Sequence, residues 1–239
     1  MIDTEYRKPD FAQLPRTRLE SMRDSGQEVL ECQRVLQRGG LNIVGEVLRE
    51  QGTFYEMDHY PKGDVYDPDS HSQYYYHSHR SNQYEHGHFH TFLRSAGMPK
   101  GVAPAPYSGD EPWPLGDEAL SHLISISMDK AGVAIGLFTV NRWVTGDTWY
   151  PAADVIRMLD LFVIDHDYTS WPTNRWISAM IGFYYPQIVE LIKQRDRVVE
   201  DWAEMYPDLD VYEDRKLEIT GFVKISDQEQ IDATNSSLA

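Results

Sequence analysis

Residues 73–94 read QYYYHSHRSNQYEHGHFHTFLR, and five of the chain's nine histidines fall within this stretch. They are His77, His79, His86, His88 and His90. Spacing at every second residue is the period of a β-strand, in which alternate side chains point to the same face. The polar segment 81–84 suits a short hairpin loop. The stretch therefore predicts two antiparallel strands with histidines on one face.

The register of this predicted hairpin decides whether the histidines meet. A loop over 81–84 places Arg80 opposite Glu85. The next rungs are His79 with His86, His77 with His88, and Tyr75 with His90. Opposed Cβ atoms lie about 4.5–5.5 Å apart, and an imidazole nitrogen binds a metal at about 2.0–2.1 Å. We expect all five imidazoles on one face around a metal ion, whereas a slip of one residue would send the two sets to opposite faces.

The histidine-rich stretch is also compatible with roles that need no metal. Histidines on strands are often half-buried polar residues, and a cluster of them can stack on tyrosines or form a pH-sensitive patch. Five imidazoles on one small face would crowd and, when protonated, repel one another, so a shared cation is the simpler hypothesis. The cluster is internal and interleaved with aromatic residues, which excludes a purification tag.

Composition limits the class of protein. A chain of 239 residues with 41% hydrophobic and 12% aromatic residues predicts one folded domain over 1–225, followed by a flexible tail over 226–239. The formal net charge of −16 argues against a nucleic acid or an anionic membrane as partner. No apolar run approaches the ~20 residues of a membrane span, and the N-terminus lacks the apolar core of a signal peptide. The expected location is the cytoplasm.

Cys32 is the only cysteine, which excludes an intrachain disulfide and a cysteine-based metal site. Any transition metal must therefore be held by nitrogen and oxygen. Cys32 lies in a helical pattern with no histidine nearby in sequence, so we expect a small buried residue rather than a nucleophile.

The rest of the chain predicts an α+β fold. Apolar residues recur at helical spacing over 14–39, 151–164, 174–184 and 188–206. Strand patterns cover 120–127 and 133–140, and 217–225 is a candidate edge strand. We expect an antiparallel sheet of four or more strands, flanked by helices from the N- and C-terminal parts. Segment 53–69 reads as a loop, and the proline-rich segment 95–116 as a lid over the histidine face or a wrapping surface loop.

Several side chains outside the five histidines are candidates for the site. His59 is a further candidate metal ligand from the 53–69 loop. Tyr75 would supply an aromatic wall and a phenolic hydrogen bond, and Glu85 is the nearest candidate general base. Arg142 follows a predicted strand end, where it would clamp a substrate carboxylate or pair with a surface acid. His122 is as consistent with a core-edge residue as with a ligand.

The segments QYYYHSHR, EHGHFHTFLR and NRWVTGDTW resemble an uncharacterised bacterial domain-of-unknown-function family, and that resemblance implies no activity. The His-x-His strands are also similar to the metal-binding face of cupin-like sheets, although the glycine-spaced cupin pattern with its glutamate is not reproduced. No phosphate-binding loop, G-x-S-x-G elbow, H-E-x-x-H helix or Rossmann fingerprint occurs.

The sequence therefore predicts a metal-dependent enzyme that acts on a small molecule, with a non-haem redox role favoured over hydrolysis. Imidazole sites without thiolate suit iron, copper or zinc, and iron is favoured because no general base other than Glu85 lies in the motif. One alternative is a non-catalytic metal-handling protein, and another is a structural zinc site or a dimer seam. A homodimer is an open option.

Overall fold

The computed structural model describes residues 5–79 and 84–239, and in these residues six strands form one antiparallel sheet in chain order. The strands are β1 (Tyr60–Tyr66), β2 (Ser72–His77), β3 (Gly87–Arg94), β4 (Leu120–Met128), β5 (Ala134–Val140) and β6 (Ile219–Lys224). Each strand therefore pairs with its neighbours in sequence, although helices α3–α6, within residues 142–205, lie in the connection between β5 and β6.

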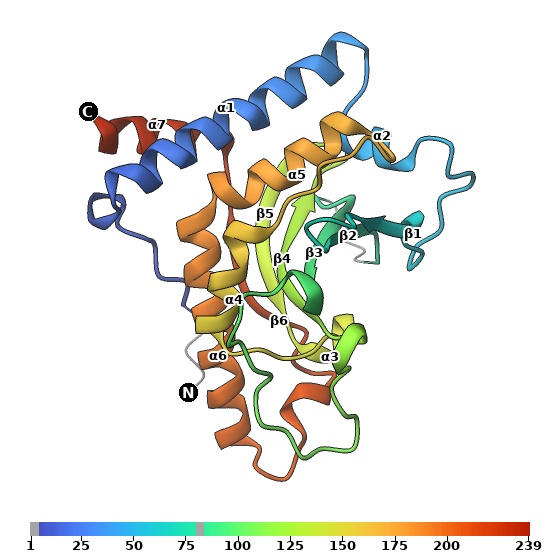
Figure 1. Ribbon diagram of the computed structural model, residues 1–239, viewed down its shortest axis with the longest axis vertical. Coiled ribbons are helices and arrows are strands. Elements are labelled where there is room, and N and C mark those ends of the chain that lie inside the picture. Colours follow the sequence, from blue (N-terminus) through green and yellow to red (C-terminus); the bar gives the residue numbers. More distant parts are fainter. Residues whose placement is uncertain (1–4, 80–83) are drawn as a thin grey trace.

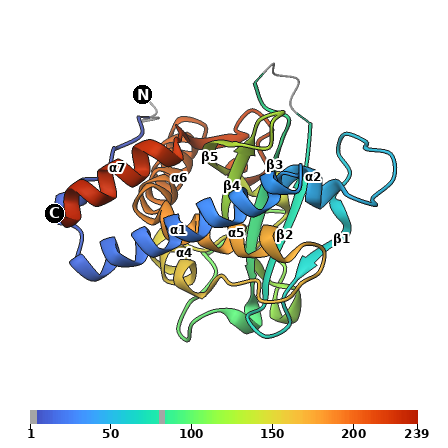
Figure 2. The same ribbon diagram turned by 90° about the horizontal axis from the view of Figure 1, so that it is seen from above.

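Helices from both ends of the chain complete a mixed α+β fold, as predicted. They are α1 (Arg16–Arg38), α2 (Ile43–Leu48), α3 (Arg142–Thr145), α4 (Ala152–Met158), α5 (Trp171–Phe183), α6 (Tyr185–Met205) and α7 (Asp227–Leu238). Helices α1, α5 and α6 gather on one side of the sheet (Figures 1 and 2). In the described part of the chain, every helix is too short or too polar to cross a membrane.

The two faces of the sheet have different chemistry because alternate side chains point to opposite faces. Tyr74, Tyr76 and Phe89 are buried in one hydrophobic core with residues of α1, α5 and α6. Tyr75, between the two tyrosines, and His90, directly after Phe89, point to the opposite face. The sheet thus buries aromatic residues under the helices and presents histidines on the other face, which we call the histidine face.

The predicted register of the hairpin is confirmed at two rungs. Tyr75 pairs with His90, and His77 pairs with His88. The predicted rung of His79 with His86 is absent, because β2 ends at His77 and β3 begins at Gly87. The expected pairing of Arg80 with Glu85, and most of the predicted loop 81–84, lie outside the described residues.

Two predictions about irregular segments need correction. Segment 53–69 contains strand β1, whose pairing with β2 is interrupted by an irregularity between Tyr60 and Val65. The expected flexible tail 226–239 instead forms helix α7, which packs against α1. The Ser226 side chain accepts a hydrogen bond from the backbone of Glu229 and caps this helix. A serine followed three residues later by glutamate is the sequence signal for such a cap.

The proline-rich segment between β3 and β4 forms part of a second, smaller core. Trp113 is buried there and packs with Trp149 and Val198, and its indole nitrogen donates to the Ala105 carbonyl at 2.8 Å. The segment therefore follows the wrapping course that the sequence offered as one option, with Trp113 as its anchor. That residues 1–225 form a single domain stays a prediction.

Candidate metal centre

Three buried imidazoles meet on the histidine face: His77 from β2, and His88 and His90 from β3. Each offers one ring nitrogen, and the three nitrogens lie within 4.8 Å of one another. The Nε2 atoms of His77 and His88 are 2.8 Å apart. Two nitrogens bound to one metal at about 2.1 Å are separated by about 3.0 Å at a right angle and about 3.4 Å at the tetrahedral angle. This cluster could hold a metal ion after a small outward adjustment of the rings.

The far nitrogen of His88 is held by a carboxylate. The Nδ1 atom of His88 lies 2.8 Å from Oε1 of Glu85, and the other carboxylate oxygen of Glu85 accepts a hydrogen bond from the Ser127 hydroxyl. Because an ionised carboxylate only accepts, the proton of His88 sits on Nδ1 and its Nε2 lone pair points toward His77. Metal-binding histidines commonly donate their second nitrogen to a carboxylate in this way.

The far nitrogen of His90 has partners on β4. Its Nδ1 atom lies 2.9 Å from the Ser125 hydroxyl and 3.1 Å from Nε2 of His122. The Ser125 hydroxyl is also 3.0 Å from the same His122 nitrogen. Burial, followed by the positive charge of Arg195, lowers the pKa of His122 to about 3, so this imidazole is neutral. With Nδ1 engaged, we assign Nε2 of His90 as its metal-binding nitrogen.

Aromatic rings surround the three imidazoles. The Tyr75 ring centroid lies 5.2 Å from that of His90 and 5.3 Å from that of His77. On its outer side Tyr75 stacks on His59 at 3.6 Å, and the His59 side chain is 44% exposed. Burial, followed by the charges of Asp64 and Asp147, raises the pKa of the Tyr75 phenol, which keeps it protonated. His59 and Tyr75 therefore lie between the cluster and solvent.

The two remaining histidines of the hairpin have different positions. The half-buried His79 lies at the edge of the cluster, with ring centroids 5.0 Å from His77 and 5.1 Å from His88. His86 faces the other way: its Nδ1 atom contacts the Tyr76 hydroxyl at 2.6 Å. The expectation that all five imidazoles share one face is therefore wrong for His86, because regular strand geometry begins only at Gly87.

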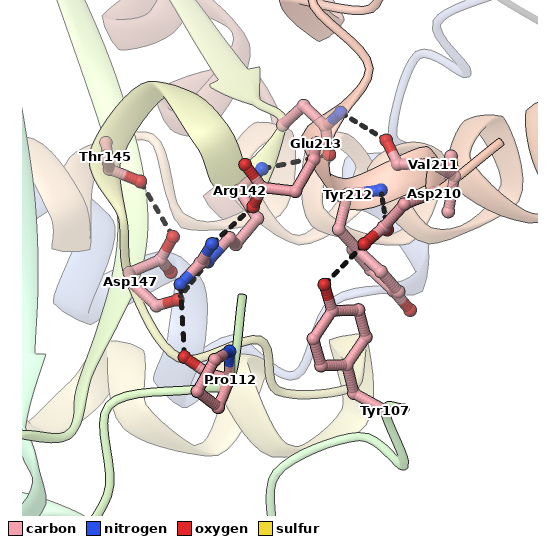
Figure 3. A network of polar contacts seen from close by, with 10 residues as sticks. Tyr107, Pro112, Arg142, Thr145, Asp147, Asp210, Val211, Tyr212 and Glu213 are labelled. Atoms are coloured by element: carbon pink, nitrogen blue, oxygen red, sulfur yellow. Dashed lines mark hydrogen bonds and ion pairs between the residues drawn. The ribbon is translucent and has the colours of Figure 1, made fainter. Parts of the chain in front are cut away.

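Arg142 belongs to a polar network at the end of β5 (Figure 3). Its guanidinium pairs with the carboxylate of Glu213 and donates to the Asp147 carbonyl at 3.2 Å. Figure 3 also shows Arg142 reaching the Pro112 carbonyl, at 3.4 Å. Of the two roles that the sequence left open, the ion pair is observed with Glu213, and the substrate clamp stays a prediction.

Sequence reasoning missed Ser125 and Ser127 and left the role of His122 undecided. The alternation in LSHLISIS predicted a strand but gave no sign that its hydroxyls would face histidines more than 30 residues earlier in the chain. The only signal was that Ser125 and Ser127 alternate with Ile124 and Ile126.

Fold and cluster together define a mixed α+β protein with a buried three-histidine group suited to a metal ion. The chain belongs to the family described as a domain of unknown function, DUF6969, which it matches over residues 23–225. No curated protein and no solved structure matches the chain, so the cupin-like resemblance stays unconfirmed.

Proposed function

We propose that the protein is a metal-dependent enzyme that binds a divalent transition metal through His77, His88 and His90. The observation that carries this proposal is the convergence of three buried nitrogens, all within 4.8 Å of one another. Burial of an imidazole removes the water that hydrogen-bonds to its nitrogens, and this costs free energy unless a partner or an ion replaces the water. A shared metal ion would replace the water for all three rings. The carboxylate on the far side of His88 adds support, because it is typical of metal-bound histidine.

Three protein ligands favour catalysis over a purely structural role. Structural zinc sites are usually closed by four protein ligands, whereas catalytic sites keep a position for water or substrate. The metal would supply Lewis acidity or one-electron chemistry at that position. His77, His88 and His90 would hold it, and the Tyr75 phenol beside His90 would donate a hydrogen bond to a small-molecule substrate.

We favour iron and a non-haem redox reaction. This choice is preferred over copper, and over zinc with a hydrolytic reaction. Hydrolysis needs a general base beside the metal-bound water. Glu85, the nearest carboxylate, has one oxygen on His88 and the other on Ser127, so it orients a ligand and is poorly placed to take a proton from substrate. A three-nitrogen set without thiolate is compatible with iron, copper and zinc.

One observation favours a second candidate function. His79 lies within about 5 Å, ring centre to ring centre, of both His77 and His88. If His79 turned inward as a fourth ligand, the site would be closed and would serve a structural or metal-handling role. The difference between the two functions is therefore the presence of an open coordination position.

The first experiment measures metal in untagged protein by elemental analysis. We expect about one metal ion per chain, and less than a tenth of that in His77→Ala and His88→Ala. The matched control is His86→Ala, which removes a histidine from the same hairpin but on the opposite face. Equal metal content in all of these variants would exclude the proposed site.

The second experiment separates the two functions. Protein loaded anaerobically with Fe(II) is exposed to nitric oxide, which binds iron only at an open position. The high-spin EPR signal of a ferrous nitrosyl in the wild type supports the enzyme. No signal in the wild type, with a signal in His79→Ala, would support the closed site. A cytoplasmic location and a homodimer remain proposals that fractionation and sedimentation would test.

A further inference from the structure

We propose that strand β4 supplies the positioning residues of this metal centre: Ser127, through Glu85, and Ser125, with His122, fix His88 and His90 in the tautomer that presents Nε2 to the ion. This inference rests on the proposed metal site and adds the residues that prepare its ligands. None of these four side chains needs to touch the metal, so they are positioning residues.

The pairing of β3 with β4 places one serine opposite each of the two ligands on β3, His88 and His90. His88 pairs with Ser127, and His90 pairs with Ser125. Directly opposed residues of an antiparallel pair project to the same face, so each serine stands beside the ring of its partner histidine. The His-x-His motif on β3 thus meets a Ser-x-Ser motif on β4, and both serines are buried.

We call the hydrogen bonds that link a serine of β4 to a histidine of β3 an arm. The arm that reaches His88 runs through the Glu85 carboxylate. Ser127 donates to one oxygen of Glu85, and Nδ1 of His88 donates to the other at 2.8 Å. Glu85 is 6% exposed and His88 is fully buried, so water does not compete for these hydrogen bonds. The arrangement leaves the Nε2 lone pair of His88 directed at the cluster.

The arm that reaches His90 ends on His122. His90 Nδ1 lies 2.9 Å from the Ser125 hydroxyl, which lies 3.0 Å from His122 Nε2. For His90 to present its Nε2 lone pair, its proton must sit on Nδ1, so that Nδ1 donates to the Ser125 oxygen and the Ser125 hydroxyl donates to His122 Nε2. His122 is itself held by its backbone N–H, which donates to the Asp147 carboxylate at 2.9 Å.

The two arms have the same chemical effect. A neutral imidazole that donated from Nε2 would place a proton where the metal must bind. Anchoring both Nδ1 atoms removes this competitor and also fixes the ring orientation. Loss of such outer partners typically lowers metal affinity about 10–100-fold.

The alternative is that the hydroxyls only satisfy buried polar groups and have no influence on the ligands. Two measurements separate a positioning role from a merely structural one. The first is the tautomer of His88 and His90 in the metal-free protein, from long-range proton–nitrogen NMR of ¹⁵N-labelled histidine. The second is the affinity for Co(II), titrated through its visible absorption. Removal of a merely structural serine would change neither.

The variants are Ser125→Ala, Ser127→Ala and Glu85→Ala, with Glu85→Asp as the conservative change. Ser121→Ala is the matched control, because Ser121 is a buried serine of the same strand whose hydroxyl, among the described residues, reaches only the His122 carbonyl, at 3.5 Å. Circular dichroism checks that each variant is folded.

We expect the Nδ1–H tautomer at His88 and His90 in the wild type. Ser125→Ala should shift His90 toward Nε2–H and Glu85→Ala should shift His88, each with about 10–100-fold weaker Co(II) binding, partly restored in Glu85→Asp. Ser121→Ala should behave as the wild type. Unchanged tautomers and affinities in folded variants would overturn the inference. A wild type that shows these tautomers but binds no Co(II) would refute the proposed function instead.

Discussion

Gly87→Ala tests whether the close approach of β2 and β3 sets the ligand geometry. Gly87 lies between His86 and His88 at the start of β3. A Cβ atom built on Gly87 would lie 2.5 Å from the His77 carbonyl oxygen and 2.5 Å from the Tyr76 hydroxyl. Ordinary contact begins at 3.4 Å, so the alanine needs 3.4 − 2.5 = 0.9 Å of extra room.

That displacement falls on the rung that joins His77 to His88. The clash with the His77 carbonyl involves backbone, so a rotamer change cannot relieve it. Overpacking of this kind costs about 1–3 kcal/mol of unfolding free energy. Metal–ligand distances tolerate only about ±0.2 Å, so a shift several times larger between two of three ligands should lower the affinity for Co(II) at least about 10-fold.

Urea denaturation and Co(II) titration measure the two effects on the same protein. The control is Gly45→Ala in helix α2, where the new Cβ would be 3.4 Å from its nearest neighbour, a side-chain oxygen. Alanine there should leave Co(II) affinity unchanged and stabilise by up to about 1 kcal/mol. A Gly87→Ala protein that binds Co(II) as tightly as the wild type would refute the idea that this strand spacing determines the ligand geometry.

Three further predictions concern the scaffold. Burial, with Glu28 beside it, raises the pKa of the Cys32 thiol to about 12, so a thiol reagent at pH 8 should label Cys32 only after unfolding. Burial opposes ionisation of Asp67, but backbone N–H groups, among them that of Asp165 at 2.7 Å, outweigh it and lower the pKa. Asp67→Asn should therefore cost about 1–3 kcal/mol in urea melts at pH 7, with the difference shrinking as the pH falls below about 3.8 and the wild-type carboxylate is protonated; equal stability at pH 7 would contradict this. Deletion of 227–239 should lower the melting temperature, because Gln230 donates to the Phe183 carbonyl at 2.6 Å, and an unchanged temperature would show that α7 contributes nothing.

The spacing of residues within short segments was sufficient to predict the hairpin and the class of fold. The two-residue period of 73–94 and one short connection fix which residues are opposed, because hairpin register depends on the turn and the strand period alone. Of the three predicted rungs that lie within the described residues, two are present, and they bring His77, His88 and Tyr75 together as expected. The helices were predictable for a similar reason, since their apolar spacing lies within single segments.

His86 marks where the local pattern failed. Its spacing is that of His88, but the chain enters the strand only at Gly87, and the Tyr76 hydroxyl holds the His86 ring on the core side. A two-residue period predicts a shared face only while the backbone stays extended. Where a strand begins depends on its partner, and here the backbone N–H of His86 donates to the carbonyl of Met128 on β4.

The sequence by itself determined that histidines alternate on two adjacent strands, that nitrogen and oxygen are the available metal ligands, and that helices would cover one face of the sheet. Only the tertiary structure decided which three imidazoles converge and which side chains hold them. The physical reason is that the register of β4 against β3 depends on packing of the whole sheet, including an irregularity between Thr91 and Phe92. That packing places Ser125, Ser127 and His122 behind ligands from which they are distant in sequence.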